Sequence, residues 1–208
     1  MRYGKIFGMG NINFRKTTFL KAAATIKQCP SQELPEIVLC GRSNVGKSSL
    51  VNALADNSKL ARTSSSPGKT RQVVYFEVDK SLLIADLPGY GYAKVSREKS
   101  EAFSSLCDDY FTSGRKISLA LILLDIRREP SDKDIMMLDY LNSTDIPYFI
   151  VFTKCDKMSR SQCLTRQRQL ADMFRFSPDA QVYAVSSDKK LGITELADGI
   201  ADFIGSLS

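Results

Sequence analysis

One short glycine-rich segment limits what this chain can fold into more than any other part of the sequence. Residues 41–48, GRSNVGKS, fit the pattern GxxxxGK[ST] and stand between an apolar run and a stretch of helical period. Glycines at these places let the backbone curl, so that successive N–H groups and the N-terminus of the next helix point at a phosphate. The segment therefore predicts a phosphate loop, with nucleotide contacts from Gly41, Arg42, Ser43, Asn44, Val45, Gly46, Lys47 and Ser48.

The rest of the chain alternates short, β-branched apolar runs with longer segments of helical period, which is typical of a parallel sheet with crossover helices. Only three residues separate the second and third runs, which suits a hairpin, so we expect one antiparallel edge strand. The predicted fold class is α/β, with about six strands and helices on both faces of the sheet. Strands are expected at 37–40, 73–78, 82–85, 117–124, 148–152 and 181–185, and helices at about 47–56, 96–112, 131–142, 159–174 and 192–206.

Composition narrows the chemistry and the cellular setting. A chain of 208 residues suits one globular domain, and no run approaches the roughly 18 apolar residues of a membrane span. Histidine is absent, which argues against histidine-based hydrolase and zinc chemistry. The five cysteines are scattered and form no CxxC pair, which indicates free thiols in a reducing compartment. Any catalysis is expected to come from positioning and electrostatics.

The net charge of +6 is unevenly placed along the chain. Residues 1–32 hold six basic residues and no acid, which leaves 23 basic against 23 acidic residues in 33–208. We predict a basic N-terminal extension over 1–32 and one domain over 33–208. The extension has no apolar stretch of the kind found in secretory signals. It could contact RNA phosphates, act as an organellar transit segment or simply be solvated, and the sequence leaves these three open.

A second motif supplies the other side of a magnesium site. In phosphate loops the lysine reaches the β- and γ-phosphates and the hydroxyl ligates Mg²⁺, so Lys47 is a candidate catalytic residue and Ser48 a candidate metal ligand. DLPG, at the end of the third predicted strand, fits DxxG, in which the aspartate holds magnesium through water and the glycine N–H meets the γ-phosphate. Alone, DLPG is equally a common turn. Its place at a strand end favours nucleotide contacts from Asp86, Leu87, Pro88 and Gly89.

A third motif separates guanine from adenine. TKCD, after the fifth predicted strand, fits [NT]KxD. The Asp156 carboxylate would accept hydrogen bonds from guanine N1 and the 2-amino group, which adenine cannot offer, and ATP would leave that carboxylate unpaired at a large cost. The Lys154 stem would lie along the base and ribose. The order of the three motifs predicts GTP as the nucleotide, with contacts from Thr153, Lys154, Cys155 and Asp156.

Three loops complete the expected site. Segments 57–72 and 87–94 are rich in polar residues, glycine and proline, and we expect them to be mobile. Thr63 and Thr70 are the candidates for a threonine that closes on magnesium and the γ-phosphate, and we choose Thr70 because it directly precedes the predicted edge strand. The serines after the sixth strand fit a loop whose N–H meets guanine O6, although a plain turn is an equal alternative. These loops add Gly68, Lys69, Thr70, Arg71, Gln72, Val185, Ser186 and Ser187 to the predicted contacts.

Taken together, GRSNVGKSSLVNAL, SPGKTRQ, DLPGYGYAK, TKCD and SS resemble the EngB (YihA/YsxC-type) GTPases of bacteria and organelles, from about residue 14 to the C-terminus. The PGKT segment before the edge strand and the DLPGYGYA run are the most specific parts, because ordinary Ras-like proteins do not share them. The resemblance implies a Ras-like P-loop GTPase fold and a monomeric, cytoplasmic GTPase. It also implies a role in assembly of the large ribosomal subunit, linked to normal cell division and septation. An organellar matrix is the second choice of location.

Tyr90 follows DxxG where Ras-like enzymes place the glutamine that orients the attacking water. We therefore expect slow intrinsic hydrolysis, completed by a partner, ribosomal RNA or a monovalent cation. Asn44 matches the asparagine that helps hold K⁺ in potassium-activated GTPases of similar type, although asparagine also commonly just caps a loop. The expected catalytic group is Lys47, Asn44, Thr70 and Gly89, with Mg²⁺ bound by Ser48 and Thr70.

Two other functions remain open at this point. The chain could be a nucleotide-gated RNA-binding module in which the basic extension does the work and hydrolysis is incidental. It could also be a P-loop kinase or ATPase, which the TKCD motif argues against.

Overall fold

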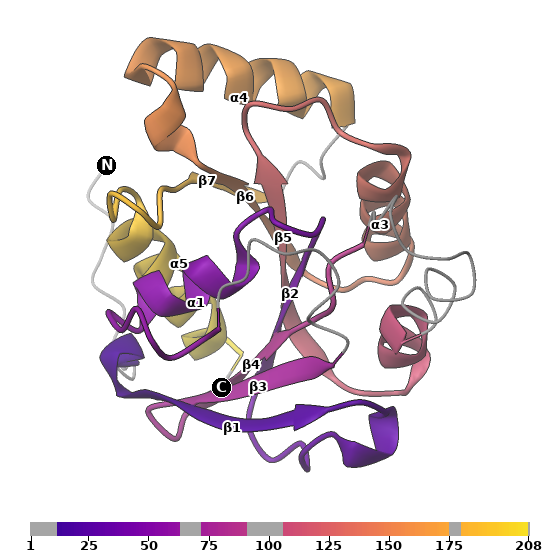
Figure 1. Ribbon diagram of the computed structural model, residues 1–208. Helices are drawn as coiled ribbons and strands as arrows, with labels where there is room; N and C mark the ends of the chain where they lie inside the picture. The colour runs from indigo at the N-terminus through magenta and orange to yellow at the C-terminus, as the bar shows by residue number, and fades with distance from the viewer. Residues whose placement is uncertain (1–11, 63–71, 91–105, 175–179, 208) are drawn as a thin grey trace.

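The computed structural model describes residues 12–62, 72–90, 106–174 and 180–207. Seven strands form one sheet in the order β1-β3-β4-β2-β5-β6-β7 (Figure 1). Strands β4, β2, β5, β6 and β7 run parallel to one another, and β3 is antiparallel to both β1 and β4. Their bounds are β1 Thr17–Ala23, β2 Glu36–Gly41, β3 Val73–Val78, β4 Leu82–Asp86, β5 Ile117–Asp125, β6 Tyr148–Thr153 and β7 Gln181–Ala184.

Helices cover both faces of this sheet, which explains why the central strands are continuous apolar runs. Helices α1 and α5 pack on one face, where Leu50 and Leu196 join the core formed with β2 and β5. The helical segment 106–112, α3 and α4 pack on the other face, so that the sheet separates them from α1 and α5 (Figure 1). The helix bounds are α1 Lys47–Leu54, α3 Asp132–Ser143, α4 Arg160–Phe174 and α5 Ile193–Gly205.

The predicted α/β class is confirmed, and all six predicted strands are present within one or two residues of their expected ends. Of the helix predicted at 96–112, residues 106–112 are described and helical, and the earlier part lies outside the described residues. No helix in the described part of the chain is long and apolar enough to cross a membrane.

Strand β1 is the element that the sequence did not predict. It pairs with β3, with Thr17 opposite Val78 and Ala23 opposite Val73, so β1 occupies the edge and β3 lies one strand inside it. The reason for the miss is physical: most of β1 is exposed or half-buried and a bulge interrupts its register, so it lacks a clean apolar alternation. Residues 17–23 of the predicted N-terminal extension thus belong to the sheet.

The parallel strands place the candidate functional segments at one end of the sheet. The carboxyl ends of β2, β4, β5 and β6 are Gly41, Asp86, Asp125 and Thr153. Leu39 of β2 pairs with Asp86, and Gly41 pairs with Leu123, so these ends lie side by side. Ligands of open α/β sheets bind at such carboxyl ends. The fold therefore brings the three sequence motifs to a common site.

Candidate nucleotide site

The phosphate loop runs from Gly41, the last residue of β2, to Lys47, the first residue of α1. Gly41 has φ +150° and Gly46 has φ +116°, values that residues with a side chain rarely adopt. A Cβ at Gly41 would also lie only 2.7 Å from the carbonyl oxygen of Leu123 on β5. Asn44 lies between them in the left-handed region at φ 62°, which asparagine tolerates well. The curled loop therefore depends on these residue types.

Lys47 is buried, with 7 % of its surface exposed, and it lies back across its own loop. Its Nζ donates a 3.3 Å hydrogen bond to the carbonyl oxygen of Gly41. A buried ammonium group is costly unless an anion compensates it. The position of Lys47 therefore suits an anionic ligand at the mouth of the loop, as predicted for the β- and γ-phosphates.

Ser48 and Asp86 form a second polar centre beside the loop. The Ser48 hydroxyl donates a 2.7 Å hydrogen bond to Oδ2 of Asp86, which is 3 % exposed. Burial raises the pKa of Asp86, while the charge of Lys47 and the Ser48 hydrogen bond oppose that shift. The other carboxylate oxygen, Oδ1, is buried and has no hydrogen-bond partner among the described residues.

This unpartnered oxygen suits a divalent cation. A carboxylate and a hydroxyl are oxygen ligands of the kind that Mg²⁺ prefers. Within the described residues, no three acidic, cysteine or histidine side chains gather around one point. Ser48 and Asp86 would therefore have to share the ion with phosphate oxygens and water, as nucleotide sites commonly do.

The DLPG segment is packed directly on the phosphate loop. The Ser43 hydroxyl donates a 2.9 Å hydrogen bond to the carbonyl oxygen of Gly89, and the Ser43 N–H donates one of 3.0 Å to the carbonyl oxygen of Tyr90. A Cβ at Gly89 would lie 2.7 Å from Cα and N of Ser43. Glycine at position 89 is therefore required by close approach.

Lys154 fastens the guanine side of the site to the phosphate loop. It has φ 62°, and its Nζ donates 2.9 Å hydrogen bonds to the carbonyl oxygen of Asn44 and to Oδ2 of Asp125. The neighbouring Thr153 hydroxyl lies 2.8 Å from the carbonyl oxygen of Val45. The end of β6 is thus bound to the loop at two successive residues.

Asp125 is a site residue that the sequence analysis missed. Burial opposes its ionisation, but hydrogen bonds from Arg127 and Lys154 outweigh burial and hold the pKa of Asp125 well below its ordinary value. Arg127 binds both carboxylate oxygens, at 2.8 and 2.7 Å. A signal was present, because Asp125 directly follows the predicted strand 117–124, as Asp86 follows the strand 82–85.

Asp156 is held ready to accept hydrogen bonds. Its Oδ1 accepts a 2.7 Å hydrogen bond from the Ser186 hydroxyl, and Lys157 forms a 2.7 Å ion pair with Oδ2. The Lys157 hydrogen bond and then the Ser186 hydrogen bond lower the pKa of Asp156. The side chain is 7 % exposed. At neutral pH the site therefore presents a fixed carboxylate.

Ser186 is fixed in turn by its own loop. It is 1 % exposed and exchanges two backbone hydrogen bonds with Leu191, at 2.9 and 3.1 Å. Gly192 closes the loop at φ +66°, where a Cβ would lie 2.2 Å from the carbonyl oxygen of Ala184. Because the Ser186 N–H already bonds Leu191, Ser187 is the better candidate of the two for the predicted N–H contact with guanine O6, which stays a prediction.

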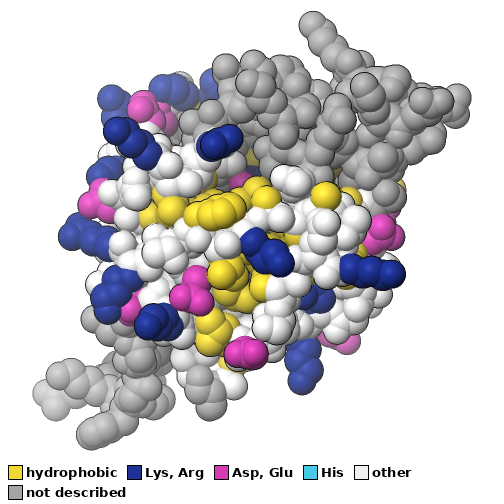
Figure 2. Space-filling model, turned by 60° about the horizontal axis from the view of Figure 1, so that its bottom comes forward, with side chains coloured by type: hydrophobic (Ala, Val, Ile, Leu, Met, Phe, Trp, Pro, Cys, Tyr) yellow, Lys and Arg dark blue, Asp and Glu magenta, His cyan; other side chains and the backbone are white. Residues whose placement is uncertain are grey.

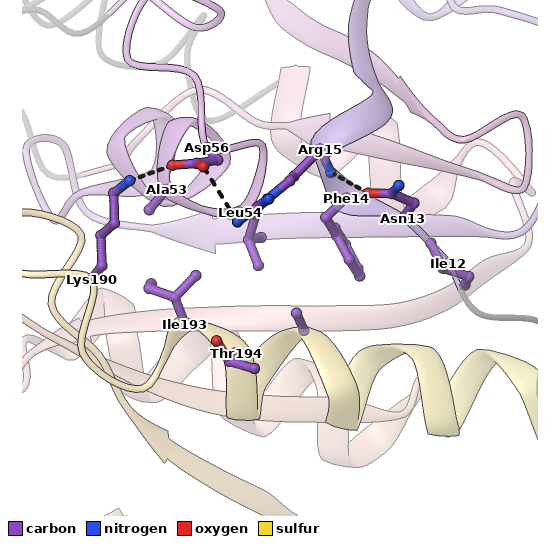
Figure 3. A pocket seen from close by; sticks show the side chains of 11 residues that line it. Ile12, Asn13, Phe14, Arg15, Ala53, Leu54, Asp56, Lys190, Ile193 and Thr194 are labelled. Carbon is purple, nitrogen blue, oxygen red and sulfur yellow. Dashed lines mark hydrogen bonds and ion pairs between the residues drawn. The ribbon is translucent and has the colours of Figure 1, made fainter.

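A pocket of about 520 Å³ adjoins the same loop, between the start of the described chain, α1 and α5 (Figure 3). Lys190 of the loop and Arg15 both form ion pairs with Asp56, at the rim. The ion pairs connect the loop after β7 to the end of α1. The lining residues are Ile12, Asn13, Phe14, Arg15, Ala53, Leu54, Asp56, Lys190, Ile193, Thr194 and Ala197, none of which is a predicted nucleotide contact.

The structure therefore brings the phosphate loop, DLPG, TKCD and the Ser186–Ser187 turn to one end of the sheet. Gln72 is described and exposed at the start of β3. The predicted contacts Gly68, Lys69, Thr70 and Arg71 lie outside the described residues, as does Thr63. The predicted closure of Thr70 on the γ-phosphate thus stays a prediction.

Comparison with known proteins identifies the class of protein to which this site belongs. A family model described as 50S ribosome-binding GTPase matches residues 36–154, more than half of the chain. The chain is accordingly a GTP-binding protein of the P-loop class and a GTP-hydrolysing enzyme. The probable GTP-binding protein EngB of Alkaliphilus metalliredigens is 38 % identical over 191 residues, which cover 92 % of each chain. The EngB of Streptococcus equi subsp. zooepidemicus is 38 % identical over 193 residues, 93 % of this chain and 97 % of that one. The chain belongs to the EngB family.

Solved structures agree in fold. The crystal structure of a probable GTP-binding protein EngB has a TM-score of 0.68 at 24 % identity, and the match covers 81 % of this chain and 98 % of that one. Aquifex aeolicus Era bound to GDP and AlF4⁻ also has a TM-score of 0.68, at 20 % identity, over 83 % of this chain and 57 % of Era. At these identities the likeness supports the Ras-like fold alone.

Proposed function

We propose that this GTPase is a nucleotide-dependent switch that assists assembly of the large ribosomal subunit. The observation that carries the proposal is the convergence of Lys47, the Ser48–Asp86 pair and the Asp156–Ser186 pair at one end of the sheet, in a family described as ribosome-binding. We propose that it acts as a monomer in the bacterial cytoplasm and is needed for normal cell division and septation.

The residues divide into a guanine half and a phosphate half. Asp156 accepts from the base, the Lys154 stem covers it and Ser187 offers its N–H, so specificity resides at the ends of β6 and β7. Loop N–H groups and Lys47 hold the phosphates. Ser48, Thr70 and, through water, Asp86 would hold Mg²⁺, which when bound offsets the negative charge of the phosphates.

Hydrolysis in this site lacks the usual water-orienting glutamine. Tyr90 stands in its place, and its hydroxyl is already bonded to Asp134. We propose that Asn44 holds K⁺ beside the phosphates and that ribosomal RNA or protein completes the site, so intrinsic turnover is slow. Single-turnover rates in potassium and in sodium test this part. Equal rates in the two salts, with and without ribosomal particles, would remove potassium from the proposal.

The variant Asp156→Asn tests the switch directly, because an amide donates where the carboxylate accepts and so suits the C2 carbonyl of xanthine. We expect this variant to co-sediment with purified large subunits in a non-hydrolysable XTP analogue, and not in XDP or in the matching GTP analogue. The wild-type protein in the GTP analogue and in GDP is the control. Equal co-sedimentation in the triphosphate and diphosphate would contradict a nucleotide-dependent switch.

A second candidate, an RNA-binding module with incidental hydrolysis, is favoured by the basic segment around β1. Residues 12–32 contain Arg15, Lys16, Lys21 and Lys27 and no acid, and Phe19 and Leu20 are exposed there. Figure 2, in which the lower side of Figure 1 comes forward, shows Lys and Arg side chains around exposed hydrophobic side chains, with some Asp and Glu among them. Cations beside an exposed ring are features of RNA-binding surfaces.

Point variants test this candidate, because deleting residues 1–32 would remove β1 from the sheet. The double variant Lys21→Ala/Lys27→Ala is compared with Lys116→Ala/Lys133→Ala, two lysines elsewhere on the surface. If the module reading holds, the first pair weakens binding to large subunits in every nucleotide state and flattens its salt dependence. If both pairs behave alike, the basic segment is only solvated.

A further inference from the structure

Tyr90, directly after DLPG, is held at both its backbone and its side chain. Its carbonyl oxygen accepts the 3.0 Å hydrogen bond from the Ser43 N–H, and its hydroxyl donates a 2.8 Å hydrogen bond to Oδ1 of Asp134. Ser43 belongs to the phosphate loop, and Asp134 lies in the first turn of α3. Tyr90 therefore links the phosphate loop to a helix on the other side of the sheet from α1.

Asp134 is a firm anchor for that hydroxyl. It is 2 % exposed, and its second oxygen, Oδ2, accepts hydrogen bonds from the N–H and the hydroxyl of Ser131, at 2.8 and 2.7 Å. Burial, and then the nearby Asp134 carboxylate, raise the pKa of Tyr90, so its hydroxyl keeps its proton at neutral pH and stays a donor. A hydrogen bond from a neutral hydroxyl to a buried carboxylate is among the stronger kinds.

Gly89 lies immediately before the anchored tyrosine. Its carbonyl oxygen accepts from the Ser43 hydroxyl, and its Cα lies so close to Ser43 that no Cβ would fit. Gly89 also carries the N–H that is expected to meet the γ-phosphate. Whatever fixes Tyr90 against Ser43 and Asp134 therefore also limits where that N–H can lie.

We propose that Asp134 is a positioning residue for GTP hydrolysis, which holds the Tyr90 hydroxyl and thereby keeps Gly89 against the phosphate loop, in place for the γ-phosphate. GDP has no γ-phosphate, so the link contributes to binding and hydrolysis of GTP and not to binding of GDP. The inference rests on GTP hydrolysis by the isolated protein and is independent of the ribosomal role. It also gives Tyr90 a structural task in place of the missing glutamine's chemistry.

The variant Tyr90→Phe removes the hydroxyl and keeps the ring. We expect single-turnover hydrolysis in potassium buffer to slow about tenfold and affinity for a non-hydrolysable GTP analogue to fall by a similar factor, in line with the loss of one hydrogen bond to a charged group. Affinity for GDP should stay within about twofold of wild type. Tyr183→Phe is the matched control, because that hydroxyl bonds Gln181 at the far edge strand.

Two further variants separate positioning from helix stability. Ser131→Ala removes the hydroxyl hydrogen bond to Oδ2 and keeps the one from the backbone N–H. The Tyr90 contact with Oδ1 is also left in place, so the hydrolysis rate of this variant should match wild type. Asp134→Ala should reproduce the loss in Tyr90→Phe, and the double variant should be no slower than the slower single one, because the two residues act through one contact. Unchanged or faster hydrolysis in Tyr90→Phe, or an equal fall in GDP and GTP-analogue affinity, would overturn the proposal. If Asp134→Ala does not fold, Tyr90→Phe alone decides the matter.

Discussion

Replacement of Asp125 by alanine should weaken the binding of GDP and GTP alike. Asp125 is 7 % exposed at its side chain and accepts the 2.9 Å hydrogen bond from Lys154, which is 30 % exposed and also bonds Asn44. A hydrogen bond to a charged group contributes about 1.5–3 kcal/mol. Because Lys154 is partly solvated and keeps its bond to Asn44, we expect a loss of about 1–2 kcal/mol, which is roughly 5- to 30-fold in Kd.

Equilibrium titration with fluorescently labelled GDP measures this loss directly. Asp125→Asn is the conservative variant, because its carbonyl oxygen can still accept from Lys154, and it should recover most of the affinity. Asp139→Ala, an exposed acid on α3, is the charge-matched control and should bind like wild type. A Kd for Asp125→Ala within twofold of wild type would show that Asn44 alone orients Lys154, and would refute this reading of Asp125.

Three other changes have clear expected outcomes. Gly192→Ala should destabilise the fold by more than about 1 kcal/mol in chemical denaturation, because the added Cβ would meet a backbone oxygen at a positive φ, and a free energy of unfolding equal to wild type would contradict that strain. Arg115→Ala should cost about 3–5 kcal/mol in the same assay, because it leaves the fully buried Glu36 carboxylate without its ion pair, whereas Lys116→Ala on the surface should be nearly neutral. Guanine binding should not vary with the titration of Asp156 between pH 5 and 8. The pKa of Asp156 is lowered from its ordinary value, first by the Lys157 hydrogen bond and then by that of Ser186, so the carboxylate is charged in this range and is protonated only at more acidic pH. A fall in GDP affinity between pH 6 and 5, with the fold intact by circular dichroism, would count against this.

The sequence predicted the central part of the fold because each local signal there agrees with the global one. Runs such as Ile117–Asp125 are continuously apolar because both faces of the sheet are covered, and glycines at 41 and 46 stand where the backbone needs positive φ. In a parallel sheet the carboxyl ends of the strands meet at one edge, so segments that directly follow these strands lie close together. For these reasons the sequence alone predicts that the phosphate loop, DLPG and TKCD lie at one site.

Contacts between residues far apart in the chain could not be predicted from the sequence. β1 forms through pairing with β3 and not through an apolar pattern of its own, so the periodicity of the sequence does not predict this strand. The Tyr90–Asp134 and Lys154–Asp125 bonds span 44 and 29 residues, and nothing local in either partner selects the other. The Glu36–Arg115 ion pair spans 79 residues, and no local sequence pattern predicts it either.

The two halves of the site differ in a way that bears on switching. In the guanine half, Asp156 is held by Ser186 and Lys157. Lys154 is held by Asp125 and by the carbonyl oxygen of Asn44, so these side chains are fixed and meet the same base in GTP and GDP. In the phosphate half, and within the described residues, Oδ1 of Asp86 is unpartnered and Lys47 makes one long hydrogen bond, of 3.3 Å, to the carbonyl oxygen of Gly41. A ligand can shift a protein between states only through contacts that differ between them. The guanine half should therefore set affinity for both nucleotides equally, while discrimination between GTP and GDP must come from the phosphate half and from the Ser43–Gly89–Tyr90 link that borders it.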